Sequence, residues 1–568
     1  MTRPAQRWDV KPPIPSDVRA ALGAYPDVVA QLLYNRGLAT AEAAERYFSG
    51  QLSHPGDPAQ LLNLPLAVDR LHHALRSGER LAVYGDYDAD GVTATALLVQ
   101  VLSAMGGAVQ AYFPLRDEEG YGLNIEALRK LRSDGVNVVV SVDCGVRSLA
   151  EAAEARRLGL DLIITDHHEP GAELPDALAV IDPKQPGETY PKEDLAGVGL
   201  AYKLAQGLIR GWPTRPLAAS DVLDLVALGT VADLAPLTGE NRALVRQGLA
   251  GLNRGKRLGL RALGELARLR PGQIDAAAIG YSLGPRLNAA GRLENARAAY
   301  DLLSTASPEA ARDLAGKLES QNRDRQDLTR TTQARARDLA LAAPGDGLLL
   351  FAADPDFKSG VVGLAAARLT EEFYRPAVVA TRGPDETRAS CRSIPEFHIT
   401  AALDQVAELL IRHGGHAAAA GFTTRTSDAG EVEARLKAIA SDTLAGQDLR
   451  PTQRIDVDNV PLADLTPALA DALRQFEPCG HGNPTPVLAS RGVQVVQSHT
   501  VGADGKHARL VLTDGRLTFD AIAFGQAEGL SRLGRLGRYA DLAYQLEWNE
   551  FRGEKRLQLN VRSFQPSP

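Results

Sequence analysis

Short apolar runs alternate with longer Ala/Leu-rich segments between about residues 65 and 300. The runs LAVYG, NVVVSV, DLIIT and LVALGTVA have the length and composition of buried strands, and segments 92–105 and 147–158 those of helices. This alternation predicts an α/β domain over residues 65–305, in which helices flank a parallel sheet. Ligands of such sheets bind at the carboxyl ends of the strands.

A long polar segment follows this domain. From Pro308 to about Leu341 the chain contains one glycine and no further proline, and Pro344-Gly345 lies just beyond. Proline in a first turn and Pro-Gly after the last turn bracket a helix, which at 1.5 Å per residue would span about 50 Å. A helix as polar as this one usually connects two domains, and we expect residues 306–341 to do so. An ordinary amphipathic helix on the surface of one domain fits the same pattern.

The remaining parts of the chain differ in pattern. Residues 342–450 return to strand-like runs around a helix, in DGLLLFAADPDF, GVVGLAAARLTEEF and RPAVVATRG, which predicts a second α/β domain. In residues 451–568 a lead-in segment precedes a region, from about residue 487, where apolar and polar residues alternate between Gly- and Asp-rich turns. That alternation predicts a small antiparallel barrel or sandwich. Residues 1–64 are expected to be helical and irregular.

The composition is that of an ordinary globular protein. The chain has 568 residues, of which 44% are hydrophobic and 23% charged, enough for about three domains. It lacks an apolar run of membrane-spanning length and an apolar signal core near its start. Three cysteines without a CxxC pair argue against a disulfide framework or zinc ribbon and favour a cytoplasmic location. A net charge of -7 disfavours a uniformly basic nucleic-acid binder but permits a local basic channel.

Acidic residues and histidines follow the predicted strands. The set comprises Asp86, Asp88, Asp90, Asp143, Asp166, His167, His168 and Asp233. Carboxylate and imidazole ligands suit Mn²⁺ or Mg²⁺, and paired ions of this kind commonly catalyse phosphoryl chemistry. Each motif alone has an ordinary alternative, such as a helix cap or a solvated acidic turn. Their recurrence after successive predicted strands favours one shared metal site.

The same motifs carry a family resemblance. GDYDADG, VDCG, DHH and ALGTVAD, in this order and spacing, resemble the DHH phosphoesterase superfamily. PLRDEEGYGLN, LGPRLNAAGRL, SGVVGLAAARL, ASCRSI, GGHAAAAGF and FEPCGHGNPTPV narrow the resemblance to the RecJ family of bacterial single-strand-specific 5′→3′ exonucleases. The resemblance covers the chain from about residue 65 to the end. It implies a DHH catalytic domain, a DHHA1-type substrate-binding domain over residues 342–450, and an OB-fold-like DNA-binding domain within residues 451–568.

The resemblance assigns roles to the acidic set. Five residues match the family's ligands of two divalent metal ions, with Mn²⁺ preferred and Mg²⁺ as the alternative: Asp88, Asp90, Asp143, His167 and Asp233. Asp143 is expected to bridge the two ions. Asp86, Asp166 and His168 match supporting catalytic residues, with His168 facing the scissile phosphate. The wider superfamily can place a histidine where this chain has Tyr84, which implies a more open ligand shell around one ion.

The resemblance also implies contacts to DNA. Arg116, Ser390 and Arg392 match positions that hold the 5′-phosphate, a role that suits guanidinium and hydroxyl groups; an ordinary surface position fits Arg116 equally well. Nucleotide contacts are expected from Arg286, Asn288, Arg292, Gly414, Gly415 and His416. The first three fit equally well as partners of the metal-site carboxylates, and His416 as a helix cap. Trp548 and Phe551 are expected to stack on a single strand, although some aromatic residues of this domain must belong to its core.

The implied activity is hydrolysis of single-stranded DNA from the 5′ end to mononucleotides by two-metal catalysis, serving 5′-end resection in DNA repair and recombination. Single-strand-binding protein and a RecQ-type helicase are the implied partners. Two main alternatives stay open: a DHH-type phosphodiesterase that acts on short oligoribonucleotides or cyclic dinucleotides, and a non-catalytic single-strand DNA-binding scaffold. A pyrophosphatase is a weaker third alternative, because that reaction does not need a nucleic-acid-binding barrel. The extra barrel disfavours the first alternative, and the complete set of proposed metal ligands disfavours the second.

Overall fold

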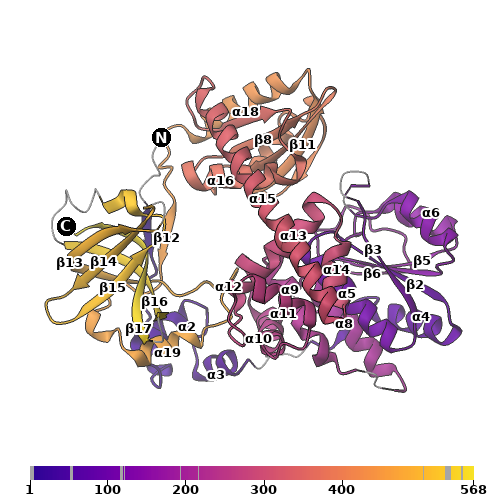
Figure 1. Ribbon diagram of the computed structural model, residues 1–568, viewed down its shortest axis with the longest axis horizontal. Helices are drawn as coiled ribbons and strands as arrows, with labels where there is room; N and C mark the ends of the chain where they lie inside the picture. The colour runs from indigo at the N-terminus through magenta and orange to yellow at the C-terminus, as the bar shows by residue number, and fades with distance from the viewer. Residues whose placement is uncertain are drawn as a thin grey trace. The chain divides into compact units, whose positions relative to one another are not determined.

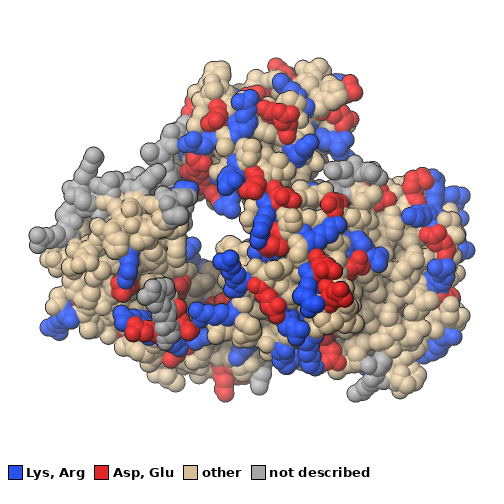
Figure 2. Space-filling view, viewed as in Figure 1, with Lys and Arg blue, Asp and Glu red and all other residues tan. Residues whose placement is uncertain are grey.

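The structure, a computed structural model, divides into two compact units. It describes residues 6–50, 56–115, 119–120, 122–191, 194–214, 217–502, 505–530, 539–551 and 554–567. The smaller unit comprises Met1–Asp9 and Arg323–Arg454, and the larger unit comprises Val10–Asn322 and Ile455–Pro568. The main segment of the smaller unit, Arg323–Arg454, is therefore inserted in the sequence of the larger one. On the face drawn in Figure 2, basic and acidic side chains are interspersed.

A five-stranded parallel sheet organises the larger unit (Figure 1). Its order is β3-β2-β4-β5-β6, with β2 at Arg80–Gly85, β3 at Ala108–Tyr112, β4 at Val138–Val142, β5 at Asp161–Thr165 and β6 at Ala179–Ile181. One face packs against α4 (Leu64–Ser77), α5 (Ala89–Ala104) and α8 (Gly197–Gly211), and the other against α6 (Ile125–Ser133) and α7 (Leu149–Arg157). Because both faces are covered, the central strands β2, β4 and β5 are largely apolar and buried. The predicted parallel sheet between helices is confirmed.

One of the predicted strands is wrong. The run LVALGTVA lies in helix α9 (Leu223–Ala232), which ends directly before Asp233. Every residue from Leu225 to Val231 is buried, because α9 packs against α5, α8 and α10 (Gly239–Asn253). A short run that is apolar all round has no periodicity to distinguish a buried helix from a buried strand. Asp233 therefore follows the end of a helix and not of a strand.

Further helices complete this part of the larger unit. They are α11 (Leu258–Leu266), α12 (Ala276–Ala278), α13 (Gly284–Leu293) and α14 (Arg297–Ser304), with one π-helical turn at Ile279–Leu283. The predicted long polar helix is present as α15 (Pro308–Ala342), whose residues 308–322 belong to the larger unit and 323–342 to the smaller. Among the described residues, no helix combines the length and the apolarity that crossing a membrane requires.

The C-terminal strands of the larger unit form a closed barrel. Its order is β13-β14-β15-β17-β16, with β13 at Leu488–Val501, β14 at His507–Thr513, β15 at Thr518–Ala523, β16 at Tyr539–Phe551 and β17 at Glu554–Pro566. All neighbouring strands are antiparallel except β15 and β17. Alternate residues such as Leu510 and Leu512 are buried, as the sequence pattern predicts. The predicted small β-barrel is confirmed.

The barrel shares its core with the N-terminal helices. These are α1 (Ser16–Ala21), α2 (Asp27–Tyr34) and α3 (Ala41–Ser49), and α19 (Pro467–Arg474) joins them. Leu32 and Leu33 are fully buried in one cluster with Phe476 and the barrel leucines. The hydroxyl of Tyr47 donates to the Phe476 carbonyl at 3.2 Å, and Arg36 Nε donates to Asn483 Oδ1 at 2.9 Å. The N-terminal segment is thus a structural part of the barrel region.

The smaller unit is built on a mixed sheet. Its order is β10-β11-β9-β8-β7, with β7 at Leu350–Asp354, β8 at Ala377–Arg382, β9 at Glu386–Arg392, β10 at Leu410–Gly415 and β11 at Ala419–Arg425. Only β7 and β8 pair in parallel. Helices α16 (Ser359–Phe373), α17 (Ile399–Asp404) and α18 (Ala429–Leu444) complete it, and β1 (Arg7–Val10) pairs with β12 (Thr452–Ile455) in a separate two-stranded sheet. The predicted second α/β domain is confirmed.

Candidate metal centre

The carboxyl edge of the parallel sheet gathers the acidic residues. Strands β2, β4 and β5 are neighbours in the sheet, and Asp86, Asp143 and Asp166 each directly follow one of them. Asp143 has φ 62°, a left-handed conformation that aspartate adopts more readily than most residues. Its backbone N–H still donates to the Thr165 carbonyl at 3.0 Å. The chain therefore turns sharply after β4 while Asp143 stays fixed beside β5.

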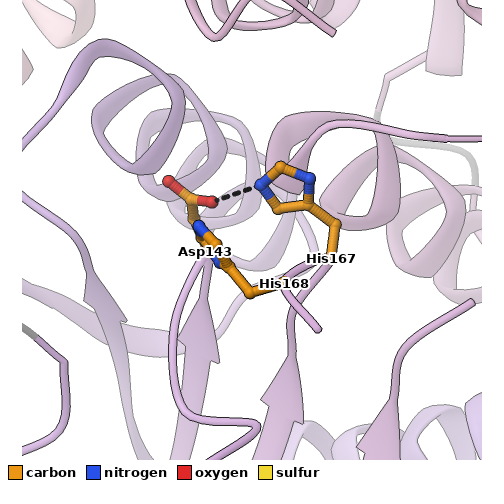
Figure 3. Close-up of side chains that lie close together, drawn as sticks. All are labelled: Asp143, His167 and His168. Carbon is orange, nitrogen blue, oxygen red and sulfur yellow. Dashed lines mark ion pairs between the residues drawn. The ribbon is translucent and has the colours of Figure 1, made fainter. Parts of the chain in front are cut away.

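His167 lies among three carboxylates. Its Nε2 is 3.1 Å from Asp143 Oδ1, and 3.9 Å from both Asp90 Oδ2 and Asp233 Oδ2. Figure 3 shows the imidazole of His167 and the carboxylate of Asp143 pointing toward one another. Burial, and then the charge of His168, lower the pKa of His167 to about 4, so that its imidazole is neutral near pH 7. A neutral imidazole nitrogen is the form that binds a metal ion.

Two groups of three side chains have the dimensions of a metal site. One group is Asp90, His167 and Asp233, and the other is Asp86, Asp88 and Asp143; in each, one ligand atom per residue lies within 4.8 Å of the others. Asp143 also forms such a group with His167 and His168. The structure thus brings together all five residues expected to bind metal, and it places Asp86 beside them in the position of a ligand.

The electrostatics of this cluster favour a bound cation. Burial, followed by the charge of neighbouring carboxylates, raises the pKa of Asp90 and of Asp143 well above the ordinary range. Burial and the charge of Asp88 raise the pKa of Asp233 to about 7. Buried carboxylates this close cannot all ionise without a compensating positive charge. Oxygen and imidazole donors in this arrangement therefore fit two hard divalent cations.

The start of helix α8 holds Asp90. The backbone N–H of Gly197 donates to Asp90 Oδ2 at 2.7 Å, and that of Val198 donates to Asp90 Oδ1 at 2.8 Å. A Cβ at Gly197 would lie 2.7 Å from the Cβ of Asp143, and a Cβ at Gly229 would lie 2.9 Å from Asp90 Oδ1. Sequence reasoning missed both glycines, although ALGTVAD contains one and AGVGL the other. Their lack of a side chain allows the acids to approach the helices closely.

Asp88 and Asn288 organise the start of helix α5. Asp88 is the N-cap residue, and its Oδ1 accepts from the backbone N–H of Asp90 at 2.9 Å and of Gly91 at 3.1 Å. Asn288 Oδ1 accepts from the N–H of Ala89 at 2.7 Å. Asp88 is therefore both the N-cap of α5 and a member of the cluster of acidic residues at the sheet edge. Asn288 anchors the loop that carries the acids.

Asp166 orients His168. Asp166 Oδ1 accepts from His168 Nδ1 at 2.7 Å and from the backbone N–H of His167 at 2.8 Å, and its Oδ2 accepts from the N–H of Val146 at 2.9 Å. Burial lowers the pKa of His168, but the hydrogen bond and charge of Asp166 outweigh it and raise the pKa overall. The His168 side chain is 43% exposed. An imidazole of fixed orientation, whose protonated form Asp166 favours, is thus accessible at the sheet edge.

Asp182 is a further strand-end acid that sequence reasoning missed. It follows β6 in VIDPK and is fully buried, and burial raises its pKa to about 7. Its Oδ1 accepts from the N–H of Lys184 at 2.8 Å. Asp182 also follows an apolar run, which is the pattern that identified the other acids. However, β6 has only three residues and was not predicted as a strand.

Tyr84 faces away from the metal cluster. Its ring is buried in the core on the α6 and α7 side of the sheet and stacks on Tyr112 at 4.9 Å between centroids. Its hydroxyl donates to the Gly122 carbonyl at 3.0 Å, and burial raises its pKa. Tyr84 therefore has a structural hydrogen bond and does not approach the cluster as a ligand.

Ser390 and Arg392 lie side by side in the smaller unit. They are two residues apart on β9, and a Cβ at Gly363 of α16 would lie 3.5 Å from Ser390 Oγ and 3.3 Å from Arg392 Nη2. Arg392 Nη1 donates to the Cys391 carbonyl at 2.8 Å. The two side chains thus meet over the first turns of α16. Arg116, the third residue expected at the 5′-phosphate, lies outside the described residues.

The other predicted DNA contacts have varied surroundings. Arg286 Nε lies 2.6 Å from Glu319 Oε2 of α15, and Arg292 is half-buried on α13. Gly414, Gly415 and the exposed His416 are at the turn between β10 and β11, where Gly415 has φ 143°. Trp548 Nε1 donates to Asp471 Oδ1 at 2.8 Å, and the Lys555 ammonium lies 4.4 Å from the Trp548 ring centroid. The side chain of Phe551 lies outside the described part of the chain.

Three protein families match successive parts of the chain. The DHH family N-terminal domain matches residues 80–230, the DHHA1 domain matches residues 346–443, and the RecJ OB domain matches residues 455–563. Their order is that of the parallel-sheet region, the smaller unit and the barrel. The matches agree with the fold and cover the elements that carry the metal cluster.

Similar proteins match nearly the whole chain. The single-stranded-DNA-specific exonuclease RecJ of Bacillus subtilis is 35% identical over 563 residues, covering 98% of this chain and 70% of that protein. The protein of the same description from Escherichia coli is 35% identical over 568 residues, covering 95% and 96%. The crystal structure of Thermus thermophilus RecJ with Mn²⁺ superposes with a TM-score of 0.84 at 30% identity, covering 99% of this chain and 80% of that one. The Mg²⁺ complex superposes with a TM-score of 0.78 at 28% identity.

Proposed function

Since this chain belongs to the RecJ family of single-stranded-DNA-specific exonucleases, we propose that it is a metal-dependent nuclease that hydrolyses single-stranded DNA from the 5′ end to mononucleotides. The observation that carries the proposal is the acidic cluster at the carboxyl edge of the parallel sheet. Its two groups of three side chains share that edge and have the size and chemistry of two divalent-metal sites.

The cluster divides into residues that hold metal and residues that act on the substrate. We assign Asp90, His167 and Asp233 to one ion and Asp86, Asp88 and Asp143 to the other, with Asp143 shared because His167 lies 3.1 Å from it. Two divalent ions, Mn²⁺ or Mg²⁺, supply charge neutralisation and an activated water at such a site when bound. Asp143 and Asp90 are buried and held by backbone hydrogen bonds or tight packing, so that the ligands are fixed in advance.

His168 is the group proposed to face the scissile phosphate. Asp166 fixes its ring through Nδ1 and favours its protonated form, which would direct positive charge toward the non-bridging oxygens as negative charge develops on them. The ring is partly exposed, whereas His167 is almost enclosed, with side-chain exposures of 43% and 16%. The difference in burial supports the division between a substrate-facing and a metal-binding histidine.

The smaller unit is proposed to hold the 5′-phosphate. Ser390 and Arg392 combine a hydroxyl and a partly buried guanidinium beside a backbone made accessible by Gly363. Charge-assisted hydrogen bonds of this type suit a terminal phosphate dianion. Arg116 is proposed as a third contact on the ground of family resemblance.

Nucleotides further along the strand are proposed to contact three regions. These are Arg286, Asn288 and Arg292 of α13, the turn of Gly414, Gly415 and His416, and Trp548 and Phe551 of the barrel. Arg286 is paired with Glu319, so a phosphate would have to compete with that carboxylate. Lys555 covers one side of the Trp548 ring, so base stacking there would involve the other side or displacement of Lys555.

The cellular role is proposed from family membership. Resection of 5′ ends in DNA repair and recombination, in the cytoplasm, is the role that fits a single-strand 5′→3′ exonuclease. Single-strand-binding protein and a RecQ-type helicase are the proposed partners, because both would present a single strand with a free 5′ end. Each proposed partner is tested by its co-purification with this chain. A second test is the effect of that partner on the digestion of a duplex with a 5′ overhang.

Digestion of one DNA strand labelled at either end tests the activity. With Mn²⁺ or Mg²⁺, a 5′ label should appear at once as a mononucleotide, while a 3′ label should remain in progressively shorter strands. EDTA should abolish both changes. Preferential cleavage of dinucleotides or cyclic dinucleotides over long strands would favour a small-substrate phosphodiesterase, and binding without cleavage would favour a non-catalytic scaffold.

A further inference from the structure

A surface hollow lies at the far end of helix α9 from the metal cluster. It has a volume of about 250 Å³ and is lined by the end of α10, by α11 and by the loops that follow each of them. Asp224, in the first turn of α9, lines the hollow, whereas Asp233 follows the last turn. The nine residue steps from Asp224 to Asp233 correspond to about 14 Å of helix. The hollow is therefore separate from the metal cluster.

The floor of the hollow is aliphatic and rigidly held. Leu252 and Leu260 are buried in the core of the larger unit, and Leu269 and Ile274 pack against that core. Asn253 fixes the opposite wall, because its Oδ1 accepts from the Ile274 N–H at 2.7 Å and its Nδ2 donates to the Ile274 carbonyl at 2.8 Å. Two hydrogen bonds to the backbone of one residue hold the loop after α11 in place.

The rim of the hollow carries an excess of positive charge. The described lining residues with charge are Arg254, Lys256, Arg257, Arg261 and Arg270, and Asp224 and Glu265. Arg257 is committed to the fold, since its Nε donates to Asp224 at 2.8 Å and its Nη1 donates to the Leu303 carbonyl at 2.7 Å. Arg254 and Lys256 are exposed and form no ion pair with a described residue. Two cations are thus available to an anion.

The remaining charged pairs on the rim are loosely held. Arg261 lies 4.0 Å from Glu265, with side-chain exposures of 55% and 64%, and Arg270 pairs with the exposed Glu550. Exposed pairs of this kind contribute little and exchange partners readily. Glu265 can therefore accept a hydrogen bond from a ligand, while Arg261 can turn toward a phosphate or stack on a ring.

A missing side chain creates part of the space. Gly264 is in the last turn of α11 and is buried, yet a Cβ at this position would meet no atom within 4 Å. Glycine is disfavoured within a helix relative to alanine. The space beside Gly264 is therefore part of the hollow, and a larger side chain at this position would fill it without a clash.

We infer that this hollow binds a nucleoside monophosphate at a site distinct from the metal centre. Arg254 and Lys256 would bind the phosphate, and the aliphatic floor would receive one face of the base, with a guanidinium plane over the other. The carboxylate of Glu265 would accept from an exocyclic amino group, which adenine, cytosine and guanine have and thymine lacks. At about 250 Å³ the hollow lies just below the usual range of small-molecule pockets, so it would enclose one nucleotide in part and would not hold a longer strand.

Hydrogen–deuterium exchange of the full chain in EDTA tests this site. EDTA removes divalent ions from the metal cluster. Slower exchange of the backbone amides of residues 249–274 on addition of a ligand, called protection below, then reports on binding in the hollow. We expect dAMP to protect these residues at millimolar concentration, and dTMP, inorganic phosphate and deoxyadenosine each to protect them at least threefold less. Equal protection by phosphate alone would mean that the hollow is a simple anion site, and protection by an acidic peptide without protection by dAMP would equally overturn the inference.

Two pairs of variants locate the effect. Gly264→Phe should abolish the protection by dAMP, whereas Gly316→Phe, at a helical glycine that also has nothing within 4 Å of its Cβ but lies outside the hollow, should retain it. Lys256→Glu should weaken dAMP binding about tenfold, and Lys130→Glu, an exposed residue of α6, should not. Protection that survives Gly264→Phe, or that is absent from the native chain, would refute the site. None of these residues belongs to the metal cluster, so the test is independent of nuclease activity.

Discussion

The carboxylate of Asp90 is bound by the first backbone N–H of helix α8: Gly197 donates to Asp90 Oδ2 at 2.7 Å. The partial positive charge of the helix start offsets part of the cost of burying this acid. The same glycine lies against Asp143, which is buried and is proposed to be shared by both ions. One residue without a side chain therefore sets the spacing between two proposed metal ligands.

Gly197→Ala should weaken metal binding while the protein stays folded. The new Cβ would lie 2.7 Å from the Cβ of Asp143, so one of the two must shift. We expect a loss of Mn²⁺ affinity of about 10- to 100-fold, as is typical when the residues supporting a ligand are changed. Titration of activity against Mn²⁺ concentration measures the change. Gly316→Ala, at a helical position with open space, is the control and should behave as the native protein.

Asp143→Asn should abolish cleavage and stabilise the metal-free protein. The amide replaces the carboxylate proposed to be shared by both ions, so activity should fall by more than about 100-fold, beyond the loss expected for a supporting residue. Burial and neighbouring carboxylates raise the pKa of Asp143, so a neutral isostere should raise the Tm measured in EDTA at pH 8. The exposed Asp176→Asn is the control for both measurements. Near-normal turnover would remove Asp143 from the metal site.

The metal-free protein should lose stability as the pH rises. The folded-state pKa values of Asp90, Asp143 and Asp233 are raised, to about 7 for Asp233, above the ordinary value for an unfolded chain. These groups therefore contribute stability that is present at low pH and lost as the pH rises toward 7. Unfolding in EDTA between pH 5 and pH 8 measures this trend. Mn²⁺ at about 100 times its Kd should restore roughly 2.7 kcal/mol, with the largest effect above pH 7, where protons no longer compete.

Asp166→Asn should move the pH dependence of the reaction. The hydrogen bond and charge of Asp166 keep the pKa of His168 above its ordinary value, so activity that needs protonated His168 is lost as the pH rises through this raised pKa. Without the carboxylate, the alkaline limb of kcat/KM against pH should shift to lower pH. We expect a decrease of about 10- to 100-fold at pH 8. The exposed Glu169→Gln nearby should leave the profile unchanged, and an unshifted limb in Asp166→Asn would separate His168 from the chemistry.

Arg392→Ala should reduce the preference for a phosphorylated 5′ end. Loss of a charge-assisted hydrogen bond corresponds to about 1.5–3 kcal/mol, or about 10- to 100-fold in the ratio of kcat/KM between phosphorylated and hydroxyl ends. Arg388→Ala provides a control on the same strand, because Arg388 is exposed and pairs with Glu386. An equal ratio in Arg392→Ala and the native protein would exclude Arg392 from the phosphate site.

The acids that follow strands could be predicted from the sequence, because the carboxyl ends of neighbouring parallel strands must share an edge. Asp86, Asp143 and Asp166 obey this rule. Asp233 was also predicted to belong to this cluster, but for a wrong reason. The apolar run before it is a buried helix whose length and composition resemble those of a strand. Asp182 was missed because its strand has only three residues.

Contacts between elements distant in the sequence could not be predicted. The pairing of Arg286 with Glu319 depends on how α13 packs against α15, and no local pattern encodes that packing. The close approach of Gly197 to Asp143 likewise depends on how the start of α8 packs against the end of β4. The sequence therefore predicts the acidic residues and histidines of the site well. It does not predict the glycines whose missing side chains allow those residues to lie close together.

The shared core of the N-terminal helices and the barrel has a consequence for synthesis of the chain. Leu33 is buried against a cluster that includes Phe476, and about 440 residues separate them. At 5–20 residues per second, a ribosome needs about 20 to 90 s to add that stretch. During this interval the apolar side of α2 has no partner from the barrel, while the inserted smaller unit is synthesised in full. The apolar side of α2 is therefore a segment of the nascent chain that a chaperone would need to cover until the barrel is synthesised.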